Sequence, residues 1–262
     1  MYRFKKFNYT DWKVWQQFAN RVLTLCLQNF QMKLDKRAWD KSFKKEGRIF
    51  TKLQEDMPRI VKLFKKNGVK RVLDLGCGSG RHVVYLAKNG FEVYGIDIAK
   101  SGIKIAKEWL KEEGLKANLK VGDIYKKLPY KDNFFDAIIC IRTLNHGKIE
   151  WIRRCIKEMK RVLKPNGFIF VTIRKHVAKK KIPNEKLYGI KWIAPRTYII
   201  LGGPEKGIPH YRFNKKILLK EFKDFKILDF WIDSENYYCF IGQFSSKLII
   251  FHFSLNNAQQ AF

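Results

Sequence analysis

The stretch VLDLGCGSGRH, residues 72–82, decides the fold of this chain. A short apolar run containing Asp74 leads into a turn where Gly76, Gly78 and Gly80 alternate with small residues. Glycine lets a backbone turn sharply and approach a ligand closely. A strand, a glycine-rich turn and a helix in this order are typical of the ligand-binding edge of a doubly wound α/β sheet.

On both sides of this stretch, short apolar runs alternate with segments of helical periodicity. This alternation predicts βαβ units and a parallel sheet covered by helices on both faces. We expect strands at residues 71–75, 91–97, 117–123, 133–141, 167–173, 226–232 and 237–244, and helices at 37–50, 58–68, 80–90, 99–114, 149–167 and 214–222. Residues 174–212, rich in lysine and interrupted by Pro and Gly, are expected to be an inserted region rather than a regular crossover.

An acidic residue stands at or next to the end of each of the first three predicted strands. Asp74 precedes the glycine turn, Asp97 ends the second strand and Asp123 ends the third. A carboxylate beside the turn suits a ligand that carries an ammonium and a sulfonium group, and it would repel a pyrophosphate. Asp97 can accept hydrogen bonds from both hydroxyls of a ribose. Asp123 can accept from an adenine amino group, with Ile124 against the ring.

The spacing of the glycines separates two classes of cofactor. A dinucleotide fingerprint that starts at Gly76 requires a third glycine at position 81, where this chain has Arg81. The residues therefore favour S-adenosylmethionine over a nicotinamide dinucleotide. A nicotinamide-dependent oxidoreductase and a module that binds S-adenosylmethionine without turnover remain as alternatives.

Residues 37–244 resemble the class I S-adenosylmethionine-dependent methyltransferases, and most closely the broad group of the methyltransferase domain 11 type. The resemblance is carried by LDLGCGSGRH, YGIDIAKSGIKIAKEWL, VGDIYKKLPYKDNFFDAIIC and RVLKPNGFIFVTI. It implies a Rossmann-like α/β fold with seven strands in the order 3-2-1-4-5-7-6, the last strand antiparallel, and helices on both faces. It also implies methyl transfer by in-line displacement, with no metal ion required.

The resemblance assigns the cofactor site to nine residues. These are Asp74, Gly76, Cys77, Gly78, Gly80, Asp97, Ile98, Asp123 and Ile124. The glycine turn with Asp74 would hold the amino-acid end of S-adenosylmethionine, Asp97 the ribose, and Asp123 with Ile124 the adenine. The size of the Cys77 side chain explains its place in the turn better than reactivity does, because no cationic residue adjoins it in sequence.

Three residues are candidates for catalysis on the acceptor side. His146 follows the fourth predicted strand, where a base could reach a substrate proton. His210 and Tyr211 lie in the insertion, which could cover the cofactor. Each has a purely structural alternative: a loop histidine bonded to the backbone for His146, and a packed turn for His210 and Tyr211.

We expect the methyl acceptor to be a small molecule, with a tRNA or rRNA acceptor as the alternative. The net charge of +30 supports nucleic acid, but the excess of lysine is spread over the whole chain. The fourth strand leads into ICIRTLN rather than an Asn/Asp-Pro-Pro-aromatic loop, and Cys140 has no neighbouring proline. Nucleic acid is therefore possible but not favoured.

The remaining expectations concern organisation and location. Residues 1–36 are predicted to be an aromatic and basic extension, 37–245 the cofactor-binding domain, and 246–262 a tail. No apolar run is long enough to span a membrane, and the N-terminus shows no secretory signal. Five scattered cysteines without a CxxC pair predict reduced thiols in a cytoplasmic protein. The acceptor atom and the oligomeric state are left open.

Overall fold

The computed structural model describes Gln16 and residues 37–175 and 187–245. The two long ranges belong to one compact unit, Asp35–Phe262. The predicted tail 246–262, nearly all of the predicted extension 1–36, and residues 176–186 of the predicted insertion lie outside the described residues. Within the described part of the chain, no helix has both the length and the apolar character needed to cross a membrane.

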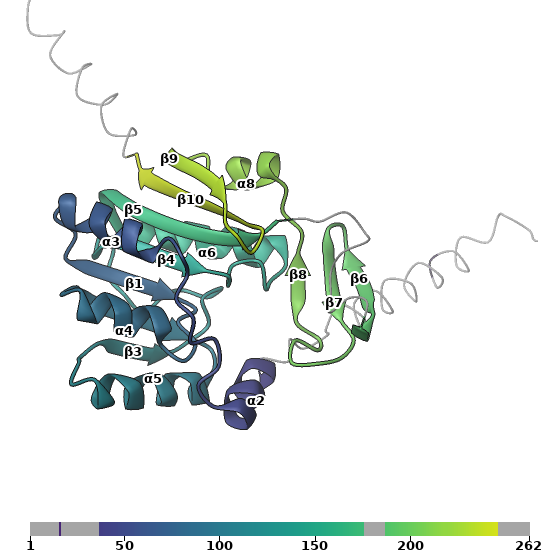
Figure 1. Ribbon diagram of the computed structural model, residues 1–262. Coiled ribbons are helices and arrows are strands. Elements are labelled where there is room, and N and C mark those ends of the chain that lie inside the picture. The colour runs from purple at the N-terminus through teal and green to yellow at the C-terminus, as the bar shows by residue number, and fades with distance from the viewer. Residues whose placement is uncertain (1–15, 17–36, 176–186, 246–262) are drawn as a thin grey trace, which may run out of the picture. The chain divides into compact units, whose positions relative to one another are not determined.

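The main sheet has seven strands in the order β3-β2-β1-β4-β5-β10-β9 (Figure 1). Their bounds are β1 Arg71–Leu75, β2 Glu92–Asp97, β3 Asn118–Val121, β4 Phe135–Ile141, β5 Leu163–Arg174, β9 Phe225–Ile232 and β10 Tyr237–Phe244. Strand β10 runs antiparallel to both neighbours, whereas β1 to β5 pair in parallel. Counted within this sheet the order is 3-2-1-4-5-7-6, as predicted; the labels reach β10 because a second sheet interrupts the count.

Helices cover both faces of the main sheet. Strand β5 shows why, because Phe168 and Phe170 pack into one apolar cluster while Ile169 and Val171 pack into the other. The helices are α2 Arg37–Glu46, α3 Met57–Lys66, α4 Arg81–Lys88, α5 Lys100–Glu112, α6 Ile149–Val162 and α8 Lys215–Glu221. Helices α3, α4 and α5 supply the first cluster, and α6 and α8 the second. Burial on both faces accounts for the nearly continuous apolar strands.

The predicted helix 149–167 is wrong at its C-terminal end. Helix α6 ends at Val162, and Leu163 is already extended and paired with Phe135 of β4. Pro165 lacks a backbone N–H and restricts the residue before it, so the helix stops ahead of it. A register shift in the β4–β5 pairing, together with a left-handed Asn166, absorbs the extra residues.

The second half of the predicted insertion 174–212 contains strands that the sequence analysis did not predict. This part forms a three-stranded antiparallel sheet, with β6 at Ile190–Ala194, β7 at Thr197–Ile200 and β8 at Pro209–Tyr211 (Figure 1). The backbone N–H of Tyr211 donates to the carbonyl of Asn145 over 2.8 Å. This bond holds β8 against the loop that follows β4.

Candidate functional site

The glycine turn between β1 and α4 has a conformation that other residues would resist. Gly76, Gly78 and Gly80 have φ angles of 78°, 52° and 95°. A Cβ atom on Gly76 would lie 2.2 Å from the Thr143 methyl carbon, and one on Gly80 would lie 2.7 Å from the Ala106 Cβ. The turn therefore requires glycine for both its backbone angles and its close contacts.

Asp97 ties this turn to the end of β2. Its Oδ2 accepts from the backbone N–H of Gly78 over 2.9 Å, and its Oδ1 accepts from that of Ala99 over 2.8 Å. Burial raises the pKa of Asp97, and these backbone hydrogen bonds oppose the rise. The Asp97 carbonyl also accepts from Gly122 N–H. That bond brings the start of the β3–β4 loop, with Asp123, beside the turn.

Asp74 is a buried carboxyl group that lacks a full set of partners. Its exposed fraction is 1%, and its Oδ2 has no hydrogen-bond partner among the described residues. Burial raises the pKa of Asp74 to about 7, with the charge of Arg81 acting against the rise and that of Asp97 adding to it. A buried acceptor without a donor is costly. A cationic ligand group would remove that cost.

The other cofactor candidates occupy positions around these two acids. The Asp123 Oδ1 accepts from Tyr125 N–H over 3.0 Å, which shapes the loop after β3. Ile124 is buried in the cluster on the α6 side, and Ile98 is half-buried beside Asp97. Cys77 is buried in the cluster on the α4 side, and burial raises the pKa of its thiol. The structure thus brings Asp74, Asp97 and Asp123 to the carboxyl ends of three adjacent strands.

Helix α2 lies over the glycine turn, a feature that the sequence did not indicate. The Phe43 ring stands 3.2 Å from the position of a Cβ on Gly78 and 3.1 Å from one on Gly102. The Asp40 Oδ1 accepts from the Ser101 backbone N–H at the start of α5 over 2.7 Å. These contacts seat α2 on the loop ends that follow β1 and β2.

The segment after α2 continues across the same edge. The Ser79 hydroxyl donates to the Ile49 carbonyl over 2.9 Å, and the Gln54 N–H donates to His82 Nε2 over 3.3 Å. Residues 37–54 therefore cross the edge of the sheet from α5 to the start of α4. A segment in this place can restrict the access of water to a ligand at the turn.

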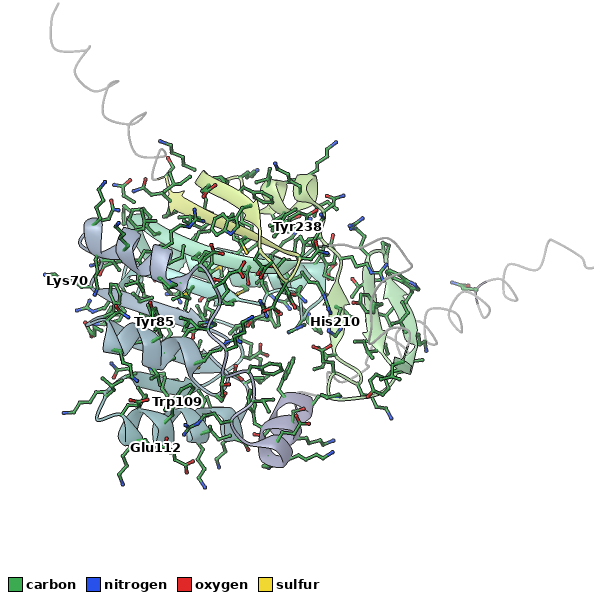
Figure 2. The ribbon with its side chains drawn as sticks, in the orientation of Figure 1. Lys70, Tyr85, Trp109, Glu112, His210 and Tyr238 are labelled. Atoms are coloured by element: carbon green, nitrogen blue, oxygen red, sulfur yellow. The ribbon has the colours of Figure 1, made fainter. Side chains whose placement is uncertain are left out.

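A second group of polar side chains, called the His146 cluster below, joins the loop after β4 to the second sheet. It consists of His146, Glu205 and His210. The Nε2 of His146 lies 3.9 Å from Glu205 Oε1, and that of His210 lies 3.4 Å from Glu205 Oε2. The exposed fractions of the three side chains are 16%, 21% and 3%. Figure 2 labels His210 on β8.

The structure brings two of the three predicted catalytic residues together. The rings of His146 and His210 meet edge to face with centroids 4.9 Å apart. Tyr211 packs its ring against Phe213 in the apolar cluster on the α6 side, because successive residues of a strand point to opposite faces. Glu205 was missed, since the sequence around it, GGPEKGIPH, carries no signal that links it to His146.

Burial and proximity set the charges of the His146 cluster. Burial, with the positive charge of His210 adding to it, lowers the pKa of His146 to about 3. Burial alone would raise the pKa of Glu205, but its contact with His210 and the charges of the two histidines lower it to about 2. The cluster therefore contains an ionised carboxylate and a neutral His146 at neutral pH.

The His146 cluster is linked to the glycine turn through one loop. Thr143 packs on Gly76, and its carbonyl accepts from His146 N–H over 3.0 Å. Trp39 of α2 contacts the His146 ring with centroids 5.4 Å apart. Both groups thus lie along the same edge of the sheet, under α2.

The residues around the turn fit S-adenosylmethionine better than a dinucleotide. Three carboxyl groups converge there, and one of them is buried with an unpartnered oxygen. Carboxylates attract an ammonium or sulfonium group and accept from hydroxyl and amino groups, whereas they repel phosphates. The close contact of Gly76 with Thr143 also leaves no room for a side chain at Gly76.

Comparison with known proteins finds methyltransferases. A family model described as a methyltransferase domain matches residues 72–167. A ubiquinone biosynthesis O-methyltransferase of Rickettsia felis is 26% identical over 149 residues, which are 56% of this chain and 59% of that protein. The mouse EEF1A lysine methyltransferase 2 is 31% identical over 157 residues, which are 51% of this chain and 63% of that protein. This chain thus spans less than two thirds of either relative.

A solved structure gives the same result for the fold. A protein of Methanosarcina mazei, described as an S-adenosylmethionine-dependent methyltransferase, superposes with a TM-score of 0.57 at 25% identity. The superposition covers 68% of this chain and 93% of that one. The shared region therefore includes nearly all of the Methanosarcina protein.

Proposed function

We propose that this chain, which belongs to the class I S-adenosylmethionine-dependent methyltransferases, transfers a methyl group to a small-molecule acceptor. The observation that supports this most is the buried Asp74, whose unpartnered oxygen lies beside the glycine turn that Asp97 organises. When bound, S-adenosylmethionine supplies an electrophilic methyl group on its sulfonium. The chain itself must bind the cofactor, align it with the acceptor and exclude water from the site.

We assign the binding roles from these contacts. Asp74 accepts from the ammonium group of the ligand, and the glycine turn lets the backbone approach the amino-acid end. Asp97 accepts from the ribose hydroxyls with the carboxylate lone pairs that its two backbone donors leave free. Asp123 accepts from the adenine amino group. Cys77, Ile98 and Ile124 give apolar contact.

The acceptor side of the site is the His146 cluster. His146 and His210 share the edge of the sheet with the glycine turn and are held by Trp39 and Tyr198. We propose that the nucleophilic group of the acceptor lies against these two histidines. A small acceptor is favoured, because α2 and β8 leave the cluster mostly buried. The name of the Rickettsia relative also indicates a small-molecule acceptor, whereas that of the mouse relative indicates a protein lysine.

A labelling experiment tests this proposal. The chain is incubated with methyl-labelled S-adenosylmethionine and, separately, with pools of small metabolites, total RNA and total protein. We expect label in the metabolite pool, lost in Asp97→Asn and kept in Glu92→Gln, a matched change at the opposite and exposed end of β2. Label only in RNA or protein would contradict the small-molecule acceptor, and label in none would contradict the activity.

A further inference from the structure

The His146 cluster contains more potential ligand atoms than a single proton acceptor requires. Three side chains from two separate parts of the chain place one ligand atom each within 4.8 Å of the others. Two of these atoms, Glu205 Oε2 and His210 Nε2, are buried and have no hydrogen-bond partner among the described residues. Only 2% of the surface of the whole His210 residue is exposed. Unsatisfied polar atoms that face one another in a buried site call for a shared partner.

The tautomer of His210 gives a second reason to expect a partner shared by these atoms. Its Nδ1 lies 2.9 Å from the carbonyl oxygen of Ile208. A carbonyl can only accept, so Nδ1 carries the hydrogen of this bond. In a neutral His210 ring, Nε2 then presents a lone pair toward Glu205 Oε2, which also accepts. Two acceptors 3.4 Å apart repel unless a cation lies between them.

From this arrangement we propose that His146, Glu205 and His210 bind a divalent transition-metal ion of the Zn²⁺ type. Two imidazole nitrogens and one carboxylate form a ligand set that such ions favour, and three protein ligands leave a coordination position open. Metal–ligand bonds of about 2.0–2.2 Å place ligand atoms roughly 3–3.5 Å apart. The Nε2 atom of His146 lies 3.9 Å from Glu205 Oε1 and that of His210 lies 3.4 Å from Glu205 Oε2, and the three ligand atoms lie within 4.8 Å of one another, so metal binding requires the side chains to draw closer.

The surroundings hold the three ligands in position. Metal-binding histidines commonly donate their second ring nitrogen to a backbone carbonyl, as His210 does to Ile208. Tyr198 stacks on the His210 ring at 5.2 Å, and Trp39 contacts the His146 ring. A single proton on His210 would pair it with Glu205 but would leave His146 without a role in the cluster. A metal ion engages all three groups.

The sequence gives no sign of this site, which departs from the expectation that no metal is bound. His146 lies far from His210 and Glu205 in the chain, and no spacing of metal-ligand type connects them. The proposal does not depend on methyl transfer, because the ligand set stands apart from Asp74, Asp97 and Asp123.

Direct metal binding tests the proposal. The full chain, with any affinity tag removed, is dialysed against a chelator and titrated with Zn²⁺ by calorimetry, and Co²⁺ is added to a second sample to follow its visible absorption. We expect stoichiometric Zn²⁺ binding and a Co²⁺ spectrum typical of nitrogen and oxygen ligands. In Glu205→Gln we expect affinity to fall by at least roughly 10–100-fold, the loss that is typical when even an outer partner of a metal ligand is changed. The control Glu221→Gln removes an equivalent carboxylate that pairs with Arg153 on the surface.

Folding of each variant is checked by circular dichroism and by binding of S-adenosylhomocysteine. His146→Asn is the second variant if Glu205→Gln does not fold. The proposal is overturned if the wild-type chain takes up no stoichiometric Zn²⁺, or if both cluster variants bind it as tightly as the wild type. Metal binding without any S-adenosylhomocysteine binding would support this site and count against the proposed function alone.

Discussion

At the scale of single residues, two acids in unlike settings lie at the proposed cofactor site. Asp97 is organised by two backbone donors, whereas Asp74 is buried with one oxygen unpartnered. These acids and the glycines between them could be predicted, because the signal is local and each position follows a strand end. The pairing of His146 with His210 through Glu205 could not be predicted, because it depends on how the insertion that contains Glu205 and His210 packs against the loop after β4.

Proton release on ligand binding follows from the raised pKa of Asp74. With a pKa of about 7, Asp74 is close to half protonated at neutral pH in the free protein. A ligand ammonium favours the carboxylate, so binding expels the proton, and affinity rises with pH through the range from about 5 to 7 by up to about tenfold per unit. We expect calorimetry of S-adenosylhomocysteine in buffers of different ionisation enthalpy to show this release.

The variant Asp74→Asn is the control for this prediction. In Asp74→Asn the proton release and the pH dependence should disappear, since no group titrates at that position. Groups whose charges face Asp74, namely Arg81 and Asp97, stay in place. Affinity that does not change with pH in the wild-type chain would contradict the assigned role of Asp74.

The steric role of Gly76 gives a second prediction. Alanine at Gly76 meets both a left-handed backbone and the Thr143 side chain, whereas alanine at Gly90 meets a similar backbone angle with no atom within 4 Å. Gly90→Ala should cost about 1–2 kcal/mol in the free energy of unfolding. Gly76→Ala should cost more and should weaken S-adenosylhomocysteine binding, as measured by urea unfolding and calorimetry. Equal effects of the two changes would contradict the tight contact.

At the scale of elements, local signals predicted the alternation of strands and helices but not every boundary. Helix α6 stops at Val162 because Pro165 acts on the residues ahead of it, and the periodic pattern does not register that effect. The β6–β7 hairpin had a usable signal in IKWIAPRTYII, where β-branched and aromatic residues flank a left-handed Arg196. The surrounding lysines, prolines and glycines are typical of loops, so the strands were not predicted.

Helix α2 is the element whose position matters most for ligand retention. Phe43 fills the space beside Gly78 and Gly102, so Phe43→Ala should loosen α2 from the glycine turn. We expect weaker S-adenosylhomocysteine binding, with faster dissociation in stopped-flow measurements, and faster hydrogen exchange in residues 37–54. Lys45→Ala, at an exposed position of the same helix, should leave both unchanged. An unaltered dissociation rate in Phe43→Ala would show that α2 does not cover the ligand.

At the scale of the whole molecule, the net charge affects the stability of the protein but does not determine its fold. The alternation of strands and helices follows from apolar periodicity, which the net charge of +30 does not alter, and the order of the strands in the sheet is the one that the family resemblance implied. Like charges repel one another in the compact state, and salt screens that repulsion. We expect the thermal midpoint to rise between about 20 and 150 mM NaCl, where the Debye length shortens toward about 8 Å. A falling midpoint would mean that attractive ion pairs, such as Arg161 with Glu158, outweigh the repulsion.

The edge formed by β1, β2 and β3 is the proposed site of S-adenosylmethionine. Calorimetric titration of the wild-type chain with S-adenosylhomocysteine and, separately, with NAD is the decisive test of this site. We expect micromolar binding of S-adenosylhomocysteine, lost in Asp97→Ala, and no binding of NAD. Absence of S-adenosylhomocysteine binding, or preference for NAD, would contradict this proposal.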